Sequence, residues 1–584
     1  MIGLILRYLT KKDWLTAAVC VVFILLQVYL DLKIPEYMNE ITDLLSTGHS
    51  GDVILDSGVK MVVCSFLSLG VSLCAGILAA RVAISLSTTL RRLQFEKVQS
   101  FSREDINRFS AASLITRSTN DVYNIQNFFA RGLNLIIKSP ILGIWAISKI
   151  NSGAFEWTVT TAVFMVLIVS VMGFLMYRFF PYTRRIQWLV DDVNGYTKEN
   201  LDGCRVIRAY NAEEQRFGKF QEANQNLYQN NIDLIRYIAP MNPWIRTMMN
   251  VVVLAIYWVG AGVIMNAGNQ ANQLNLFSDM IVFSTYATMV LNAVMMLVSI
   301  ARMTPRAMVS MKRVEEVLDH EPAIRDGDVT DEGGEGVSVE FRDVSFSYPE
   351  SDRDTLRDIS FRVEPGQTFA IIGGTGSGKS TLVNLMARMY DADSGSVLID
   401  GRDVREYTLE ALRARIGYVP QKAIIFSGSV RDNVNFGRGS DQVSDDQVWH
   451  ALDVAHATEF VERFDDKLDA LISQHGRDIS GGQKQRICIA RAVCHRPGLY
   501  IFDDSFSALD FKTDSEVRAS LSREAAGSTK VIIAQRIGTI MDADCIAVLS
   551  GGRIVGLGKH DELLRDCPEY REIAESQMMG GGPQ

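Results

Sequence analysis

The sequence lacks the cysteine and charge patterns of several protein classes. Its eight cysteines are scattered over 584 residues and include no C-x-x-C pair, so neither a zinc site nor a disulfide framework is predicted. Positive charge is not in excess either, because the net charge is −9. A nucleic-acid-binding protein would need a basic footprint that this composition does not provide. We therefore expect reduced thiols and no nucleic-acid partner.

A clear signal-peptide cleavage site is also missing near the N-terminus. Arg7, Lys11 and Lys12 precede the apolar run Trp14–Leu30, which is the order found in secretory signals. No small-residue cleavage motif follows, and the run continues into the charged Asp31. We therefore interpret this run as a retained first membrane helix.

The chain is too long for a single hydrophobic core, and its two halves differ in composition. The mean hydropathy of +0.08 averages an apolar N-terminal half and an ordinary soluble C-terminal half. We predict a membrane domain at residues 1–320, a polar, glycine-rich linker at 321–336 and a soluble domain at 337–584.

Six apolar segments in the first half are each close to the ~20 residues that cross a bilayer. They lie at 14–34, 59–80, 127–149, 157–178, 244–266 and 276–301. The polar stretches 81–126 and 179–243 keep helical spacing rather than turn signals. We therefore predict a six-helix transmembrane domain whose helices extend far beyond the lipid bilayer.

The connections between these segments alternate in positive charge. One set is nearly free of Lys and Arg: 31–58 has only Lys33 against six acids, and 150–156 and 267–279 have none. The other set, which includes the N-terminus and both long polar stretches, is rich in Arg and Lys. By the positive-inside rule, we expect both termini and the helical extensions to face the cytoplasm from a bacterial inner or plasma membrane.

Two apolar segments contain candidates for a role in the membrane. Arg131 and Lys138 lie in the third segment, where charges are functional candidates, although we favour side chains that snorkel or line an aqueous cavity. The sixth segment mixes polar side chains with methionines, which suits a permissive substrate surface or helix packing. These residues are Met280, Ser284, Thr285, Tyr286, Thr288, Met289, Asn292, Met295 and Met296.

The second half contains a phosphate-binding motif that fits G-x-x-x-x-G-K-[ST]. The apolar Phe369–Ile372 precedes it as a strand candidate, and Ser380–Arg388 follows as a helix candidate. Glycines let backbone N–H groups approach phosphate oxygens, and the helix N-terminus adds partial positive charge. We expect Lys379 to reach the outer phosphates and Ser380 to bind Mg²⁺. The motif residues are Gly373, Gly374, Thr375, Gly376, Ser377, Gly378, Lys379, Ser380 and Thr381.

A strand ending in two acids follows about 120 residues after this loop. Leu499–Asp504 is a buried-strand pattern that closes with Asp503 and Asp504. Asp503 is placed to hold Mg²⁺, directly or through water. Together the two motifs predict an α/β P-loop domain that binds ATP and Mg²⁺.

A third motif lies between them and carries a family resemblance. Ile479–Gln483 resembles the signature of ABC transporters, usually written L-S-G-G-Q. Tyr348 matches the aromatic residue that stacks on adenine, Val419–Gln421 matches the Q-loop and Ser507–Asp510 matches the D-loop. The signature residues that would contact nucleotide are Ser480, Gly481, Gly482 and Gln483.

The resemblance implies an exporter-type half-transporter that works as a head-to-tail dimer. Each ATP would lie between one subunit's P-loop and the partner's signature, with Gln421 sensing Mg²⁺ and the membrane domain. Residues 107–121 and 199–214 resemble the segments that carry the two coupling helices. Closure of the nucleotide-binding dimer would then exchange inward-open and outward-open states of the membrane domain.

Two catalytic positions depart from the family pattern. The general-base Glu is replaced by Asp504 and the switch-loop His by Gln535. Loss of one methylene retracts the carboxylate by about 1.5 Å, and a misplacement of this size costs on the order of 10²-fold in rate. Gln hydrogen-bonds phosphate but does not become a cation. We expect ATP binding to survive while hydrolysis at this site is slow.

An intact signature beside altered catalytic positions predicts a heterodimer. A homologous half-transporter would supply Glu and His to the site completed by Ser480–Gln483. This combination resembles one subunit of the heterodimeric bacterial multidrug exporters, which implies efflux of amphipathic compounds.

Other functions stay open at the level of sequence. Peptide or lipid export is a close alternative, although peptide transporters of this kind commonly carry extra N-terminal helices. Some exporter-fold proteins import siderophores, and some of these carry a fused siderophore-reductase domain that is not seen in this sequence. A channel regulator or ATP sensor would also fit slow hydrolysis.

Overall fold

The computed structural model describes residues 7–46, 51–150, 155–266, 270–331, 334, 336–349, 351, 353–437 and 443–579. The chain divides into two compact units. The membrane unit contains residues 1–97 and 112–320, and the nucleotide-binding unit contains residues 98–111 and 321–584.

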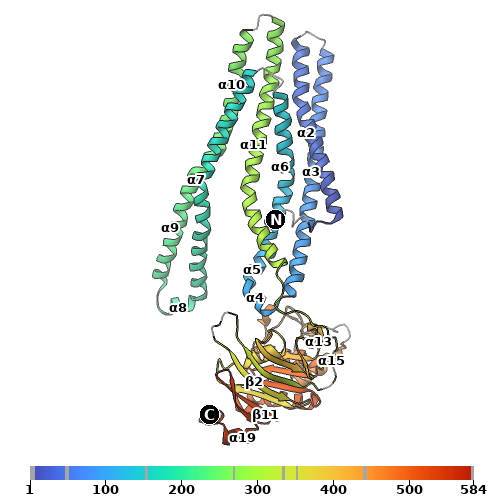
Figure 1. Cartoon of the computed structure of the whole chain (residues 1–584), viewed down its shortest axis with the longest axis vertical. Helices are drawn as coiled ribbons and strands as arrows, with labels where there is room; N and C mark the ends of the chain where they lie inside the picture. Colours follow the sequence, from blue (N-terminus) through green and yellow to red (C-terminus); the bar gives the residue numbers. More distant parts are fainter. Residues whose placement is uncertain are drawn as a thin grey trace. The chain divides into compact units, whose positions relative to one another are not determined.

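All six predicted apolar segments are helical in the membrane unit (Figure 1). Five described helical stretches are long and apolar enough to cross a membrane, namely those from Lys11, Gly51, Phe155, Glu213 and Asn272. The helix that holds the third segment, which carries the cations Arg131, Lys138 and Lys149, is not among them. The helices are α2 (Lys11–Ser46), α3 (Gly51–Gln99), α6 (Val122–Ile150), α7 (Phe155–Asp202), α10 (Met241–Met265) and α11 (Gln270–Leu318).

The polar stretches are helical, as predicted, but they are broken into pieces. Helix α3 runs to Gln99 and α7 to Asp202, well past their apolar segments. The first stretch then breaks because Ser102 caps a new helix through a capping box with Asp105. The pieces are α4 (Arg103–Phe109), α5 (Ala111–Thr116), the π-helical turn η1 (Arg117–Asp121), α8 (Cys204–Ala209) and α9 (Glu213–Ile238).

Three clusters of buried apolar side chains hold the membrane helices together. The largest cluster joins α2, α6, α7, α10 and α11 around the buried Trp157 and Phe283. A second cluster joins α3, α6 and α11 around Leu86 and Phe128, and a third joins α2 and α3 at Cys20. Many large apolar side chains remain exposed on the helices, including Trp258 at 85%. Apolar surface on this scale requires lipid or another protein chain to cover it.

The nucleotide-binding unit is built on a six-stranded sheet in the order β12-β11-β3-β10-β9-β6. All neighbouring pairs are parallel except β11 with β12. Strand β3 alternates its side chains between two cores: Ile371 faces one cluster and Ile372 the other. Both faces are therefore buried, as expected for a parallel sheet. The strands are β3 (Thr368–Gly373), β6 (Ile416–Val419), β9 (Leu499–Asp503), β10 (Thr529–Ile533), β11 (Cys545–Ser550) and β12 (Arg553–Gly558).

Smaller sheets and helices complete this unit. A four-stranded antiparallel sheet has the order β2-β1-β4-β5, and β7 pairs with β8. The strands of these two sheets are β1 (Val339–Phe346), β2 (Leu356–Val363), β4 (Ser394–Ile399), β5 (Arg402–Asp403), β7 (Gly428–Ser429) and β8 (Leu471–Ile472). The helices used below are α12 (Lys379–Met386), α17 (Gly481–Cys494), α18 (Phe511–Glu524) and α20 (Pro568–Met579).

The described part of the predicted linker is fastened to the nucleotide-binding unit. Val329 N–H donates to the carbonyl of Glu406 at 2.9 Å, and Thr408 N–H donates to the carbonyl of Val329 at 2.9 Å. The Arg388 guanidinium, which is 3% exposed, donates to the carbonyl of Arg325 at 2.8 Å. The segment therefore pairs like a short strand although its composition is polar and acidic.

Candidate nucleotide-binding site

The predicted strand, glycine loop and helix of the phosphate-binding motif are confirmed. Strand β3 ends at Gly373 and α12 begins at Lys379. Gly376 and Gly378 adopt φ values of +79° and +103°, which favour glycine. A β-carbon on Gly378 would lie 2.6 Å from Leu356 Cδ2, and one on Gly373 would lie 2.2 Å from the carbonyl oxygen of Leu549. Conformation and packing therefore both require glycines in this loop.

The side chains of this loop fit a phosphate ligand. Lys379 Nζ donates to the carbonyls of Gly373 and Gly374, each at 2.8 Å, which holds the ammonium over the loop. Burial lowers the pKa of Lys379, and the nearby Asp504 and Asp503 oppose that shift. The hydroxyl of Ser377 is buried without a hydrogen-bond partner among the described residues. A cradle with a cation and an orphaned hydroxyl suits the phosphates of ATP.

Two of the three residues predicted at the Mg²⁺ site, Ser380 and Asp503, lie together, whereas the third, Gln421, donates to Asp504. Ser380 Oγ donates to Asp503 Oδ1 at 3.0 Å, which joins the start of α12 to the end of β9. Burial raises the pKa of Asp503; the hydrogen bond from Ser380 opposes this rise and the charge of Asp504 adds to it. A hydroxyl and a carboxylate are oxygen donors of the kind Mg²⁺ prefers, so these residues fit the predicted metal.

Two predicted site residues donate to one carboxylate oxygen of a third, Asp504. Asp504 Oδ2 accepts from Gln535 Nε2 at 2.8 Å and from Gln421 Nε2 at 3.2 Å. Asp504 is 8% exposed, and this burial raises its pKa, opposed first by the hydrogen bond from Gln421. Its φ of +48° lies in the left-handed region, which Asp and Asn enter more readily than most residues. The Q-loop, the base position and the switch position thus form one cluster.

A fourth residue of this cluster was not predicted from the sequence. Gln577 on α20 donates through Nε2 to the carbonyl of Gln535 at 2.6 Å. Its Oε1 accepts from the backbone N–H of Ile537 at 2.8 Å. One side-chain amide therefore holds the backbone on both sides of Arg536. No motif marks Gln577, which lies 42 positions after Gln535.

The predicted adenine-stacking residue packs beside the loop. Tyr348 OH lies 3.1 Å from Thr381 Oγ1, the last residue of the phosphate-binding motif. Its ring makes edge contacts with Phe346 and Tyr390, at centroid distances of 5.0 and 5.3 Å. These contacts fix the ring while leaving Tyr348 partly exposed.

The signature and D-loop residues stand at helix N-termini. Ser480 caps α17 through a capping box, in which its hydroxyl accepts from Gln483 N–H at 3.3 Å and Gln483 Oε1 accepts from Ser480 N–H at 2.8 Å. Ser480 and Gly481 are exposed, and a β-carbon on Gly481 would meet no atom within 4 Å. Asp510 caps α18 by accepting from Thr513 N–H at 3.0 Å. The signature is therefore ordered and open to a ligand or another chain.

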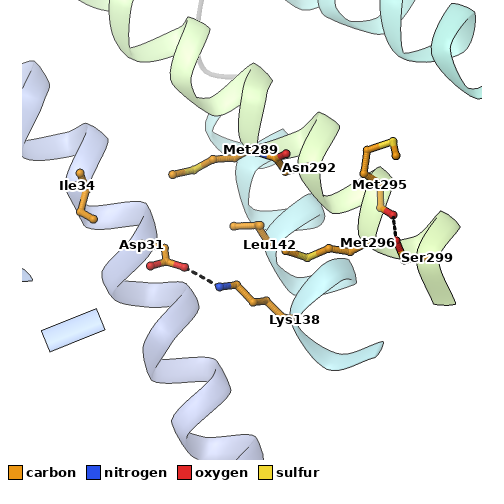
Figure 2. A pocket seen from close by; sticks show the side chains of 9 residues that line it. All are labelled: Asp31, Ile34, Lys138, Leu142, Met289, Asn292, Met295, Met296 and Ser299. Carbon is orange, nitrogen blue, oxygen red and sulfur yellow. Dashed lines mark hydrogen bonds and ion pairs between the residues drawn. The ribbon is translucent and has the colours of Figure 1, made fainter. Parts of the chain in front are cut away.

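A cavity of about 420 Å³ lies among α2, α6 and α11 of the membrane unit (Figure 2). Lys138 Nζ donates to Asp31 Oδ2 at 2.9 Å, and both residues line the cavity. Lys138 was a candidate functional residue from its place in an apolar segment, but its ion pair with Asp31 was not predicted. The lining residues are Asp31, Ile34, Lys138, Leu142, Met289, Asn292, Met295, Met296 and Ser299.

The sixth apolar segment divides between this cavity and helix packing. Met289, Asn292, Met295 and Met296 line the cavity. Most of the hydroxyls proposed with them bond to their own helix, as Ser284, Thr285 and Thr288 each donate to a carbonyl one turn earlier. Tyr286 is buried, with its hydroxyl 3.5 Å from the carbonyl of Leu32.

The fold and these motifs define a P-loop ATPase fused to a transmembrane domain. The ABC transporter family matches residues 356–507, and the ABC transporter transmembrane region matches residues 17–294. The chain belongs to the ABC transporter family and has the architecture of a type IV half-transporter. An ABC transporter domain of this kind implies ATP binding and ATPase activity.

Relatives match most of the chain. An uncharacterized ABC transporter ATP-binding protein of Mycobacterium tuberculosis is 36% identical over 94% of this chain and 93% of its own length. An ATP-dependent lipid A-core flippase of Aromatoleum aromaticum is 30% identical, over 85% of this chain and 81% of that protein. A multidrug efflux ATP-binding/permease protein of M. tuberculosis is 32% identical, over 84% of this chain and 40% of that protein.

A solved structure shares the fold. The structure of a bacterial Atm1-family ABC exporter with ATP bound has a TM-score of 0.82 and 23% identity, and the match covers 97% of this chain and 99% of that chain. The exporter fold predicted from the sequence is therefore confirmed.

Proposed function

We propose that this chain is one subunit of a heterodimeric ABC exporter that expels amphipathic compounds. It contributes a P-loop site that holds ATP but hydrolyses it slowly, and an intact signature that completes the partner's site. Residues 1–320 serve as the membrane domain, 321–336 as the connection and 337–584 as the nucleotide-binding domain. The observation that carries this proposal is the position and hydrogen bonding of the Asp504 carboxylate.

Asp504 is a poor general base for two structural reasons. Its side chain is one methylene shorter than the Glu of the family, which retracts the carboxylate by about 1.5 Å. One of its oxygens also accepts hydrogen bonds from Gln421 and Gln535, so fewer lone pairs remain for an attacking water. A base must lie within hydrogen-bond reach of the proton it removes. The position is occupied by an acid, but its geometry disfavours water activation.

Nucleotide binding at the same site is supported by intact groups. Lys379, Ser377 and the loop glycines are arranged for the phosphates, and Tyr348 stands beside Thr381 for the base. Ser380 and Asp503 are the residues that would hold Mg²⁺. When bound, Mg²⁺ would neutralise charge on the outer phosphates. The site therefore keeps what binding requires while its hydrolytic groups are altered.

The exposed signature supports a partner that is not identical to this chain. Ser480 and the N–H groups of α17 can complete an anion site for a nucleotide held by another subunit. An intact signature is useful only opposite a P-loop, and hydrolysis there requires the Glu and His that this chain lacks. A homologous half-transporter with both residues satisfies this requirement.

The amphipathic substrate class is supported by the cavity and by relatives. The cavity combines methionines with an ion pair and an amide, which suits ligands with both apolar and polar parts. One relative is named a multidrug efflux protein and another a lipid A-core flippase. Transport of a lipid is accordingly the second candidate.

Co-purification and vesicle transport test this proposal. The tagged chain, isolated from its own host's membranes, is expected to bring one homologous half-transporter with it. Inverted vesicles that contain both should accumulate an amphipathic dye with ATP, and replacing the partner's catalytic Glu should stop accumulation. Isolation as a homodimer that transports at full rate would contradict the proposal, and accumulation of a labelled lipid alone would favour the second candidate.

A further inference from the structure

The cavity of the membrane unit holds two opposite charges beside an apolar wall. Figure 2 shows Asp31 on α2 and Lys138 on α6 pointing toward one another, with Met289 and Met296 of α11 next to them. The two side chains are 24% and 14% exposed. The volume of about 420 Å³ falls within the range of small-molecule pockets, roughly 300–1,000 Å³.

The two members of this ion pair are supported unequally. Asp31 also accepts a hydrogen bond from Ser68 on α3, so its carboxylate has a second donor. Among the described residues, the Lys138 ammonium donates to Asp31 alone. A mostly buried charge that loses its only partner is costly. Whatever separates the pair must therefore provide Lys138 with a new anion.

This asymmetry distinguishes among charged ligands. A cationic ligand that takes Asp31 would leave Lys138 without a partner, and an anionic ligand that takes Lys138 would leave Asp31 with only Ser68. When a ligand that carries both charges binds, the ion pair between Asp31 and Lys138 is replaced by two ion pairs, one from each of these residues to the ligand. Charge-assisted hydrogen bonds of this kind are roughly twice as strong as neutral ones. The Asn292 amide and the Ser299 hydroxyl add polar groups to the same cavity.

We propose that this cavity binds the zwitterionic head of an amphipathic ligand. The cationic group pairs with Asp31, the anionic group pairs with Lys138, and the apolar part packs against Met289, Met295 and Met296. The proposal deepens the proposed export function and rests on it for its physiological meaning. The binding itself is a property of this chain and requires neither a partner nor ATP hydrolysis.

Binding of matched probes to the full-length chain in maltoside micelles tests the proposal. The probes share a decyl chain and differ in the head: a sulfobetaine and a phosphocholine as zwitterions, a trimethylammonium cation, a sulfate anion and an uncharged glucoside. The zwitterions are expected to bind at least about tenfold more tightly than the other three probes. Tighter binding of the phosphocholine than of the sulfobetaine would indicate that the natural ligand is a lipid. Equal binding of the two would indicate a drug-like zwitterion instead.

Two double variants make the test specific. In Asp31→Asn/Lys138→Gln both charges are removed, so the zwitterions should bind this variant no more tightly than the glucoside does. The control Glu36→Gln/Lys149→Gln removes another α2–α6 ion pair, at 2.9 Å, whose residues do not line the cavity, and it should keep the preference. Unchanged zwitterion binding in the first variant would overturn the proposal. That result would leave the heterodimer test unaffected, because no part of the binding assay involves the partner.

Discussion

Restoring the family's two catalytic side chains should activate the ATP site of this chain. The double substitution Asp504→Glu/Gln535→His lengthens the carboxylate and replaces one of the two amides that occupy it. In the native cluster, Gln535 Nε2 and Gln421 Nε2 lie 2.8 and 3.2 Å from Asp504 Oδ2.

The size of the effect follows from the geometry. One methylene moves the carboxylate by about 1.5 Å, and misplacement of about 1 Å costs on the order of 10²-fold. A 10²-fold change corresponds to about 2.7 kcal/mol of transition-state stabilisation. Glu enters the left-handed backbone region less readily than Asp, and the φ of Asp504 is +48°. We therefore expect a gain of about 10²-fold in kcat and no more.

Steady-state ATPase activity of the purified chain measures this gain. The chain is assayed alone at saturating Mg-ATP, at concentrations where cross-linking shows a dimer, because such a dimer pairs this P-loop with this chain's intact signature. Asp504→Asn is the matched control: it keeps the left-handed backbone and removes the charge, and it should change the slow native rate less than about threefold if Asp504 is not a working base. A double variant no faster than the native chain, or an Asp504→Asn variant about 10²-fold slower, would refute the reasoning.

Three further predictions concern the same unit. Gln577→Ala removes two hydrogen bonds to the switch backbone, each worth about 1 kcal/mol. Introduced into the activated double variant, it should lower kcat about tenfold without changing the Kd for ATP. Gln577→Glu keeps only the acceptor, so its kcat should lie between those of the activated double variant with Gln577 and with Ala at this position. Tyr348→Ala should weaken ATP binding about tenfold, since base stacking contributes roughly 1–3 kcal/mol, whereas Tyr348→Phe should bind normally; equal affinities in a fluorescent-nucleotide titration would contradict a stacking role. Burial raises the pKa of Asp504, so ionisation of this carboxyl destabilises the nucleotide-free fold above that pKa. Asp504→Asn should therefore raise the Tm at pH 7.5. The gain in Tm should shrink as the pH falls, because the native carboxyl then takes up its proton.

The parts of this protein that could be predicted from sequence are those set by local chemistry. The Gly373–Lys379 loop is a short segment whose φ values and close contacts require glycine, so its spacing reveals strand, loop and helix together. The apolar membrane segments are likewise visible one by one, because each must be about as long as the bilayer is thick.

Contacts between distant segments could not be predicted in the same way. Asp31 and Lys138 are 107 positions apart, and only the packing of α2 against α6 makes them a pair. Asp504 is separated from Gln421 by 83 positions and from Gln535 by 31; their altered identities were visible, but their convergence on one oxygen was not. Gln577 belongs to no motif and acts on backbone groups, which leave no pattern of their own in a sequence.

The nucleotides trapped during turnover test the central claim most directly. The tagged chain, purified with its partner and photolabelled by azido-ATP carrying an α-phosphate label, should retain triphosphate at the Lys379 site while a second homologous polypeptide carries diphosphate. A complex without a second polypeptide, or equal diphosphate in both pockets, would contradict an ATP-holding site built on Asp504 and Gln535.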